Sequence, residues 1–223
     1  MADETKNRIL DAAEALFASG GFDGTSLRKV TGVAEVNLAA VNYHFGNKEG
    51  LLHAVLARRI APVNQERLQI LDALEAEGQV PSLEEVTRAF VLPALDRHSD
   101  ERGRLFARRL LGRFFSEQGS EWLPVFLEQF REVKERFGLA FHNCLPHLSV
   151  VEVAWRMHFA IGAMAHAMAD ECRLDALSGG ACDPRDAKTL RSELVTFIVG
   201  GLSAPSHSGA APEETTPPAG EEE

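Results

Sequence analysis

Apolar residues recur along almost the whole chain at the three- and four-residue spacing of amphipathic α-helices, and no stretch alternates with the two-residue period of a β-strand. The pattern predicts an all-α fold. Predicted helices cover residues 5–20, 26–33, 38–43, 48–77, 82–95, 100–118, 121–144, 150–170 and 185–202. Pro62 should kink or split the fourth of these helices, and Pro93 should bend or end the fifth, since proline lacks a backbone N–H.

The predicted helices divide into two domains, followed by a segment of different composition. Residues 1–47 form a small three-helix head, and the long helix that follows connects it to a helical body over residues 48–202. Two helix starts in the body, at Ser82 and Ser149, have the S-x-x-E spacing of a capping box. Residues 203–223 are rich in Pro, Ser, Gly, Thr and Glu, so we predict a disordered acidic tail that cannot form a core.

The most informative stretch runs from residue 25 to residue 51 and predicts two short helices joined by a turn at 34–36. Thr25 and Asn37 are predicted to cap the two helices. The inward positions are Leu27, Val30, Ala34, Leu38 and Val41. The outward positions of the second helix are Ala39, Ala40, Asn42, Tyr43 and His44. Such small and polar side chains suit a helix that lies in the major groove of DNA.

This stretch resembles the helix-turn-helix of the TetR family of transcriptional repressors. The resemblance is carried by Arg28, Val30, Ala34, Val36, Tyr43-His44-Phe45, Lys48 and Leu51. The run NLAAVNYHFG, residues 37–46, more narrowly resembles the fatty-acid-responsive PsrA-type branch. Together with the outward positions, the resemblance predicts DNA contacts by Thr25, Arg28, Asn37, Ala39, Ala40, Asn42, Tyr43, His44 and Lys48. Among these, Thr25 and Lys48 should contact phosphates, and Asn42 suits adenine.

Two positions in the motif depart from the family pattern. Thr31 replaces the usual Ala, and Glu35 stands where the family usually has Gly at the turn. A Glu in a left-handed backbone conformation costs about 1 kcal/mol relative to Gly. Either the turn is reshaped around Glu35, or that cost is tolerated.

Charge and cysteine content change this picture only in part. The formal net charge of −10 argues at first against nucleic acid, but residues 1–60 hold 7 basic and 7 acidic residues, which leaves the excess acid elsewhere. A neutral head has weak non-specific electrostatics, so we expect affinity to come from a homodimer on a palindromic operator. The three cysteines form no CxxC pair, and the sequence shows no signal peptide, so we predict a cytoplasmic protein. No apolar run is long enough to span a membrane.

The body is predicted to bind a small apolar effector. Its notable runs are Arg109-Leu110-Leu111-Gly112 and Trp155-Arg156-Met157-His158-Phe159, and the second recurs in the PsrA-type resemblance together with Gly162. Arg109 is the candidate carboxylate anchor, because a guanidinium can hold a carboxylate through two hydrogen bonds. The full predicted effector set is Phe106, Arg109, Leu110, Phe114, Phe126, Phe130, Arg156, His158, Phe159 and Gly162. In the alternative interpretation, Arg156 and His158 are structural residues of a packed helix.

The predicted helices 150–170 and 185–202 carry more apolar surface than the body needs, and the resemblance implies a homodimer built from them as a four-helix bundle. The chain has no nucleophile elbow, no Gly-rich phosphate loop and no HExxH, so no enzyme activity and no cofactor are predicted. His142, Cys144 and His147 lack a fourth ligand, so no metal site is predicted either.

These observations favour a ligand-responsive transcriptional regulator, most simply a repressor that leaves its operator when a fatty acid or acyl thioester binds. Two alternatives stay open at this point. The first is a regulator switched by a protein partner. The second is a helical small-molecule-binding or enzymatic protein without DNA function, which the intact run from Tyr43 to Lys48 disfavours.

Overall fold

The computed structural model describes residues 2–76, 78–97, 122–170 and 172–206, and all regular secondary structure in these ranges is helical. The predicted all-α fold is thus confirmed. The head consists of α1 (Ala2–Gly20), α2 (Leu27–Ala34) and α3 (Leu38–Phe45), and α4 (Lys48–Ala76) leads from it into the body. The body helices are α5 (Leu83–Arg97), α7 (Trp122–Glu128), α8 (Arg131–Cys144), α9 (Val150–Ala169), α10 (Arg173–Leu177) and α11 (Ala187–Leu202).

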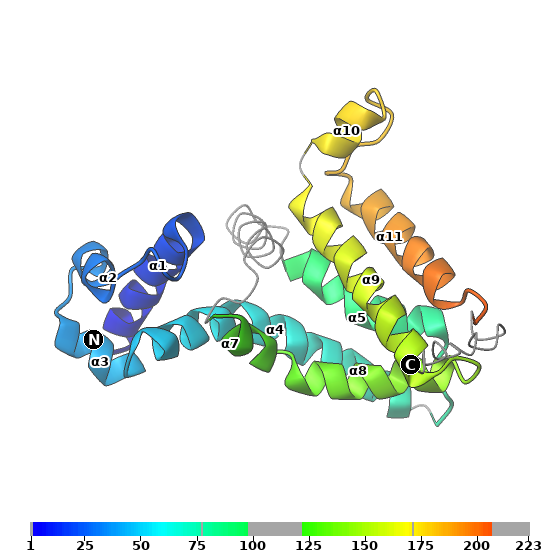
Figure 1. Ribbon diagram of the computed structural model, residues 1–223, viewed down its shortest axis with the longest axis horizontal. Helices are drawn as coiled ribbons and strands as arrows, with labels where there is room; N and C mark the ends of the chain where they lie inside the picture. The colour runs from blue at the N-terminus through cyan, green and yellow to red at the C-terminus, as the bar shows by residue number, and fades with distance from the viewer. Residues whose placement is uncertain (1, 77, 98–121, 171, 207–223) are drawn as a thin grey trace, which may run out of the picture.

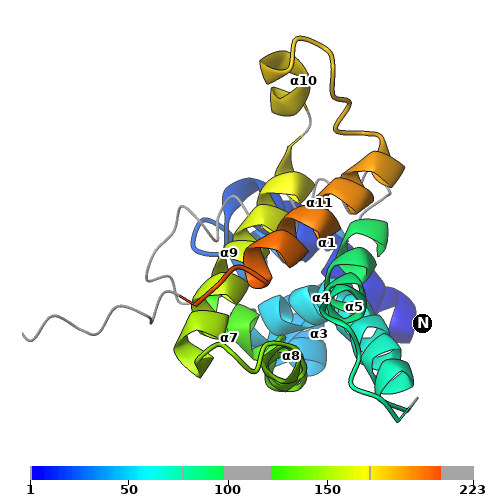
Figure 2. The ribbon, with the colours of Figure 1, turned by 90° about the vertical axis from the view of Figure 1, so that its right-hand side faces the viewer.

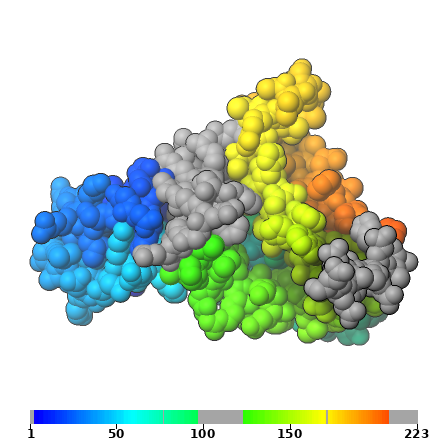
Figure 3. Space-filling model, in the orientation of Figure 1, coloured from blue at the N-terminus to red at the C-terminus, as the bar shows by residue number. Residues whose placement is uncertain are grey.

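The molecule is elongated, with the head at one end and the body at the other (Figures 1 and 3). In Figure 1, α4 runs from the head along the body, and α8 lies beside its second half. Helices α9 and α11 lie side by side, and α10 projects beyond their ends. The predicted helix over 100–118 lies outside the described residues.

Two separate hydrophobic cores hold this arrangement, and α4 contributes to both. Its first half, through Ile60, packs into the head core with α1, α2 and α3. Its second half, from Val63, packs into the body core with α5, α8, α9 and α11. The change of core falls at Pro62, yet α4 continues through this residue and is not split.

The predicted helix 121–144 is in fact two helices, α7 and α8, and the structure explains the break. The buried amide of Asn64 on α4 donates from Nδ2 to the carbonyl oxygen of Gln129, 2.7 Å away. Because the Gln129 carbonyl oxygen accepts from Asn64, it does not need a backbone N–H of a continuing helix as its donor. The break lets the chain change cores, because Phe126 and Phe130 pack against the head core and Phe137 of α8 lies in the body core.

An ionic cluster joins the head to α4. The carboxylate of Glu14 on α1 accepts from the Nε of Arg59 at 3.0 Å and also pairs with Arg58, whose Nη1 lies 2.8 Å from Asp11. The Glu14 side chain is mostly buried, so this cluster is screened less than a surface pair. The orientation of α1 is therefore coupled to the first half of α4.

The C-terminal end of α11 is held by α9. The guanidinium of Arg156 donates to the carbonyl oxygens of Leu202 at 2.7 Å and Pro205 at 2.8 Å, and also to that of Ala204. The hydroxyl of Ser206 donates to the Glu152 carboxylate at 2.6 Å. Residues 203–206, predicted as the start of the tail, are thus attached to the body in this structure, while residues 207–223 lie outside the described part.

Candidate DNA-binding and effector sites

The start of α2 corrects the predicted role of Thr25. The helix is capped by Ser26, whose hydroxyl accepts from the Lys29 amide at 3.3 Å. Thr25 is only 2% exposed, and its hydroxyl donates to the Leu16 carbonyl oxygen of α1 at 3.2 Å. Its side chain is therefore a link between α1 and α2, and in this conformation it offers no hydroxyl to a phosphate.

The turn between α2 and α3 adopts the strained geometry that the sequence left open. Glu35 has φ 52° and ψ 47°, and it is the one non-glycine residue with positive φ in the described ranges. Its amide and that of Val36 both donate to the Thr31 carbonyl oxygen, which ends α2. The turn keeps the shape that favours Gly, and the cost of Glu is tolerated.

Helix α3 presents one continuous exposed face. Asn37 caps it as predicted, accepting from the Ala40 amide at 2.8 Å. The exposed positions are Leu38, Ala39, Asn42 and Tyr43, and the Tyr43 ring is 84% exposed. Two predicted orientations are wrong: Leu38 is 44% exposed, and Ala40 packs partly against the head core with Val41. The helical period places 38, 39, 42 and 43 on one side and 40 and 41 on the other.

The neighbouring segments of the motif carry basic and polar groups. Lys48 is the first residue of α4, and its ammonium lies 4.2 Å from the centre of the Phe22 ring. The Asn47 side chain, just before this helix, accepts from the Gly50 amide at 2.8 Å. Arg28 is exposed on α2, and the half-buried His44 ring contacts that of Tyr43 edge-on at 5.1 Å. The motif thus carries an amide and an aromatic ring on α3, cations on α2 and α4, and a helix N-terminus, and such groups can bind base edges and phosphates.

A head of three helices with this exposed α3, joined by a long helix to a helical body, defines a helix-turn-helix DNA-binding regulator. Residues 9–55 match the family described as bacterial regulatory proteins, tetR family, and residues 88–201 match the family described as tetracyclin repressor-like, C-terminal domain. The chain belongs to the TetR family. Its relatives are transcriptional regulators.

Known relatives agree with this assignment. The transcriptional repressor Rv3405c of Mycobacterium tuberculosis is 29% identical over 157 residues, which cover 70% of this chain and 73% of that protein. The repressor NicS of Pseudomonas putida is 34% identical over 83 residues, 37% of this chain and 39% of NicS.

Solved structures show the same fold. The TetR-family regulator PfmR of Thermus thermophilus aligns with a TM-score of 0.55 at 18% identity, covering 88% of this chain and 100% of that one. FadR of Bacillus subtilis, solved in complex with stearoyl-CoA, aligns with a TM-score of 0.58 at 14% identity, covering 88% and 98%. At these identities the likeness concerns the fold alone.

The predicted effector residues are not gathered into one site by the described part of the structure. Phe126 and Phe130 lie against the head core, with their ring centres 5.1 Å apart. Arg156 binds the end of α11, which supports its structural interpretation. His158 and Phe159 are exposed on α9, and Gly162 is half-buried on the same helix. The remaining predicted residues, Phe106, Arg109, Leu110 and Phe114, lie outside the described residues.

The structure reveals a buried polar pair that sequence reasoning missed. Arg67 on α4 is 2% exposed, and it donates from Nε to the Phe90 carbonyl oxygen at 2.7 Å and from Nη1 to Oδ1 of Asn64 at 3.1 Å. Its guanidinium lies 4.6 Å from the centre of the Phe90 ring, and burial lowers the pKa of Arg67 to about 10. The sequence does carry a signal of this pair. Positions 60, 63, 64, 67 and 71 share one helical face, so Asn64 and Arg67 lie on the same side of the helix as apolar residues.

The structure contradicts one of the two predictions for Pro93. Helix α5 continues through this proline to Arg97, so Pro93 does not end it. The backbone N–H that Pro93 lacks would serve the carbonyl oxygen of Ala89, and Arg67 donates to the next carbonyl oxygen, that of Phe90.

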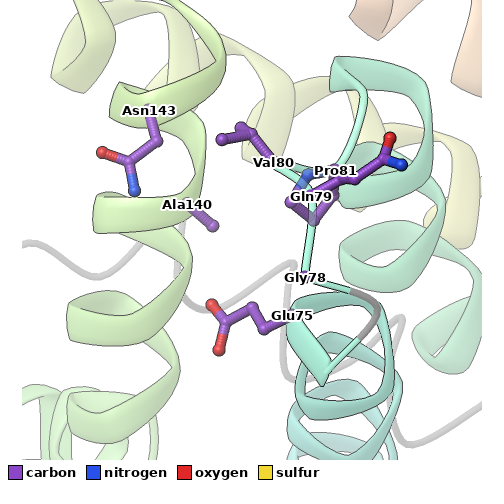
Figure 4. A pocket seen from close by; sticks show the side chains of 7 residues that line it. All are labelled: Glu75, Gly78, Gln79, Val80, Pro81, Ala140 and Asn143. Atoms are coloured by element: carbon purple, nitrogen blue, oxygen red, sulfur yellow. The ribbon is translucent and has the colours of Figure 1, made fainter.

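An open surface pocket of about 370 Å³ lies between the end of α4, the α4–α5 loop and α8 (Figure 4). Its lining residues are Glu75, Gly78, Gln79, Val80, Pro81, Ala140 and Asn143. The Glu75 carboxylate already pairs with Arg136 at 2.7 Å. No predicted effector residue lines this pocket.

Among the helices of the described ranges, none is long and apolar enough to cross a bilayer.

Proposed function

We propose that this protein is a repressor that binds a palindromic operator as a homodimer and leaves it when an apolar effector, such as a fatty acid or acyl thioester, binds in the body. The observation that carries the DNA-binding half of this proposal is the exposed face of α3, where an 84% exposed Tyr43 would otherwise be an unexplained aromatic surface. In this proposal Asn42 hydrogen-bonds a base, and Lys48 and Arg28 contact phosphates.

The dimer surface that we propose is the outer side of α9 and α11. Large apolar side chains are exposed there although they lie beside a packed core: Val151, Trp155, Phe159 and Phe197. The rings of Trp155 and Phe159 stack at 5.8 Å between centres, and His158 contacts both edge-on. A contiguous aromatic surface of this kind is typical of a protein interface. His158 and Phe159 are thus better placed to contact a second subunit than an effector.

The acyl nature of the effector is supported by two likenesses. The run 37–46 resembles the PsrA-type branch, and the fold is shared with a FadR that was solved with stearoyl-CoA. An acyl chain gains about 0.8 kcal/mol for each buried CH₂, which is roughly a fourfold gain in affinity per carbon.

Release of DNA follows from the shared helix α4. The two α3 helices of a dimer must reach half-sites about 34–36 Å apart. An effector lowers operator affinity only if it binds more tightly to a conformation with a different head separation. Because α4 is part of both cores and Glu14 joins it to α1, a shift of α4 in the body changes the position of the head.

DNA binding is tested by operator titrations with Tyr43→Ala and Lys48→Ala. Both variants should bind more weakly, and Lys48→Ala should also reduce the salt dependence by about one charge. Lys134→Ala is the matched control, because Lys134 is an exposed lysine of α8 in the body. Unchanged binding by both head variants would refute the assigned DNA surface.

Effector binding is tested by titrating the operator complex with carboxylates of increasing chain length. We expect a response that strengthens with each added carbon. The absence of a response at every length would remove the acyl effector and favour a regulator switched by a protein partner. Arg109→Ala should blunt the response if Arg109 anchors the carboxylate, as its sequence context predicts.

A further inference from the structure

Arg67 is the one charged side chain that is buried in the described part of the chain, and it faces no carboxylate there. No Asp or Glu of the described residues is buried, and burial lowers the pKa of Arg67 to about 10. Its partners among the described residues are all neutral: the carbonyl oxygen of Phe90, the amide oxygen of Asn64, the sulfur of Met164 and the Phe90 ring, whose centre lies 4.6 Å from the guanidinium.

A buried cation without an anion is costly, so its presence needs an explanation. Hydrogen bonding to the Phe90 carbonyl is an insufficient reason, because a neutral donor such as Gln could serve it without the cost of burying a charge. The weakest contact is at Nη2, which faces the Met164 thioether at 3.7 Å. Sulfur is a poor acceptor, and a methionine side chain moves easily.

We infer that Arg67, supported by Asn64, binds the anionic head of the effector, with a carboxylate oxygen taking the place of the Met164 sulfur at Nη2. This inference rests on the proposed acyl effector and names the chemistry at its polar end. Asn64 keeps Nη1 in place because its own amide is fixed to the Gln129 carbonyl oxygen at 2.7 Å. The carboxylate gains charge-assisted hydrogen bonds, and the guanidinium gains the counter-ion that it lacks.

The position of this site couples it to both functional surfaces. Arg67 lies on α4, which leads to the head, and Met164 lies on α9, whose outer side is the proposed dimer surface. Figure 2 shows α4 close to α5 and α8 in the middle of the body, with α9 and α11 over them. A carboxylate that displaces Met164 therefore acts where α4, α5 and α9 meet, and it changes the packing of the connector against the dimer helix.

The experiment compares dodecanoate with dodecanol, which has the same chain and no charge, by isothermal titration of the full-length protein. Wild-type protein should bind dodecanoate at least about tenfold more tightly than dodecanol, since one charge-assisted hydrogen bond corresponds to about that factor. Arg67→Gln should abolish this preference. The substitution keeps a donor for the Phe90 carbonyl, and Arg67→Met is the second neutral variant. Met164→Leu replaces the thioether by a hydrocarbon side chain with the same number of heavy atoms, and it should retain the preference.

The thermal unfolding of the free protein gives a second, ligand-independent measurement. If Arg67 is an unpaired cation that awaits an anion, Arg67→Gln should melt at the same temperature as wild type or higher. A clearly lower melting temperature, together with a retained preference for dodecanoate, would show that Arg67 is structural. A preference lost in Arg109→Ala and kept in Arg67→Gln would move the anchor to Arg109. Wild-type protein that binds neither ligand would overturn the acyl effector itself, and with it this site.

Discussion

Replacing Glu35 by Gly is the sharpest test of the helix-turn-helix geometry. Glu35 has a left-handed backbone at the end of α2, which costs a residue with a β-carbon about 1–2 kcal/mol. Gly removes this cost, but it also makes the unfolded chain more flexible by about 0.5–1 kcal/mol. We therefore expect Glu35→Gly to stabilise the protein by about 0.5–1 kcal/mol.

Two further variants separate the backbone effect from the loss of a negative charge. Glu35→Gln removes the charge and keeps the strained backbone, so its stability should match wild type. Glu35→Asn places a residue that tolerates this conformation better and should fall between Gln and Gly. All four proteins should be unfolded in urea at one fixed concentration, because dimer stability depends on concentration. The urea midpoint should be highest for Glu35→Gly, intermediate for Glu35→Asn, and lowest and equal for Glu35→Gln and wild type. The m-values should be unchanged.

Operator binding of the same variants tests where the turn lies. Glu35 is exposed in the turn between α2 and α3, so Gln and Gly should both strengthen operator binding by removing one negative charge from the proposed DNA-binding surface. If Glu35→Gln were as stable as Glu35→Gly, the charge and not the backbone would determine stability. If Glu35→Gly were less stable than wild type, the left-handed turn would be wrong.

Three other predictions concern contacts outside the turn. Glu14→Gln should cost about 1–2 kcal/mol in urea unfolding, because it weakens the joint with Arg58 and Arg59, and high salt should reduce the difference. Arg156→Ala should cost about 1–3 kcal/mol and weaken dimerisation in sedimentation experiments, because carbonyls at the end of α11 lose their donor. Deleting residues 207–223 should leave the melting temperature unchanged, since their composition offers little apolar surface to bury, and a clear drop would contradict this expectation.

The pairing of buried charges could not be predicted from the sequence. Arg67 is recognisable there as a polar residue on an apolar helical face, but whether an acidic residue meets it depends on which helices pack together. The same limit applies to Arg156, whose acceptors lie 46 to 49 residues away in the sequence. The break between α7 and α8 also depends on a distant partner, because Asn64 and Gln129 are 65 residues apart.

The sequence by itself determined the helical nature of the chain, the two-helix motif at 25–51 and the capping boxes at Ser82 and Ser149, both of which form. These features depend on side chains three or four residues apart, so local geometry is sufficient to produce them. Only the tertiary structure decided that Thr25 and Ala40 turn inward while Leu38 stays outside. On a short helix a shift of one position satisfies the apolar pattern almost equally well, and contact with α1 and α4 selects between the alternatives.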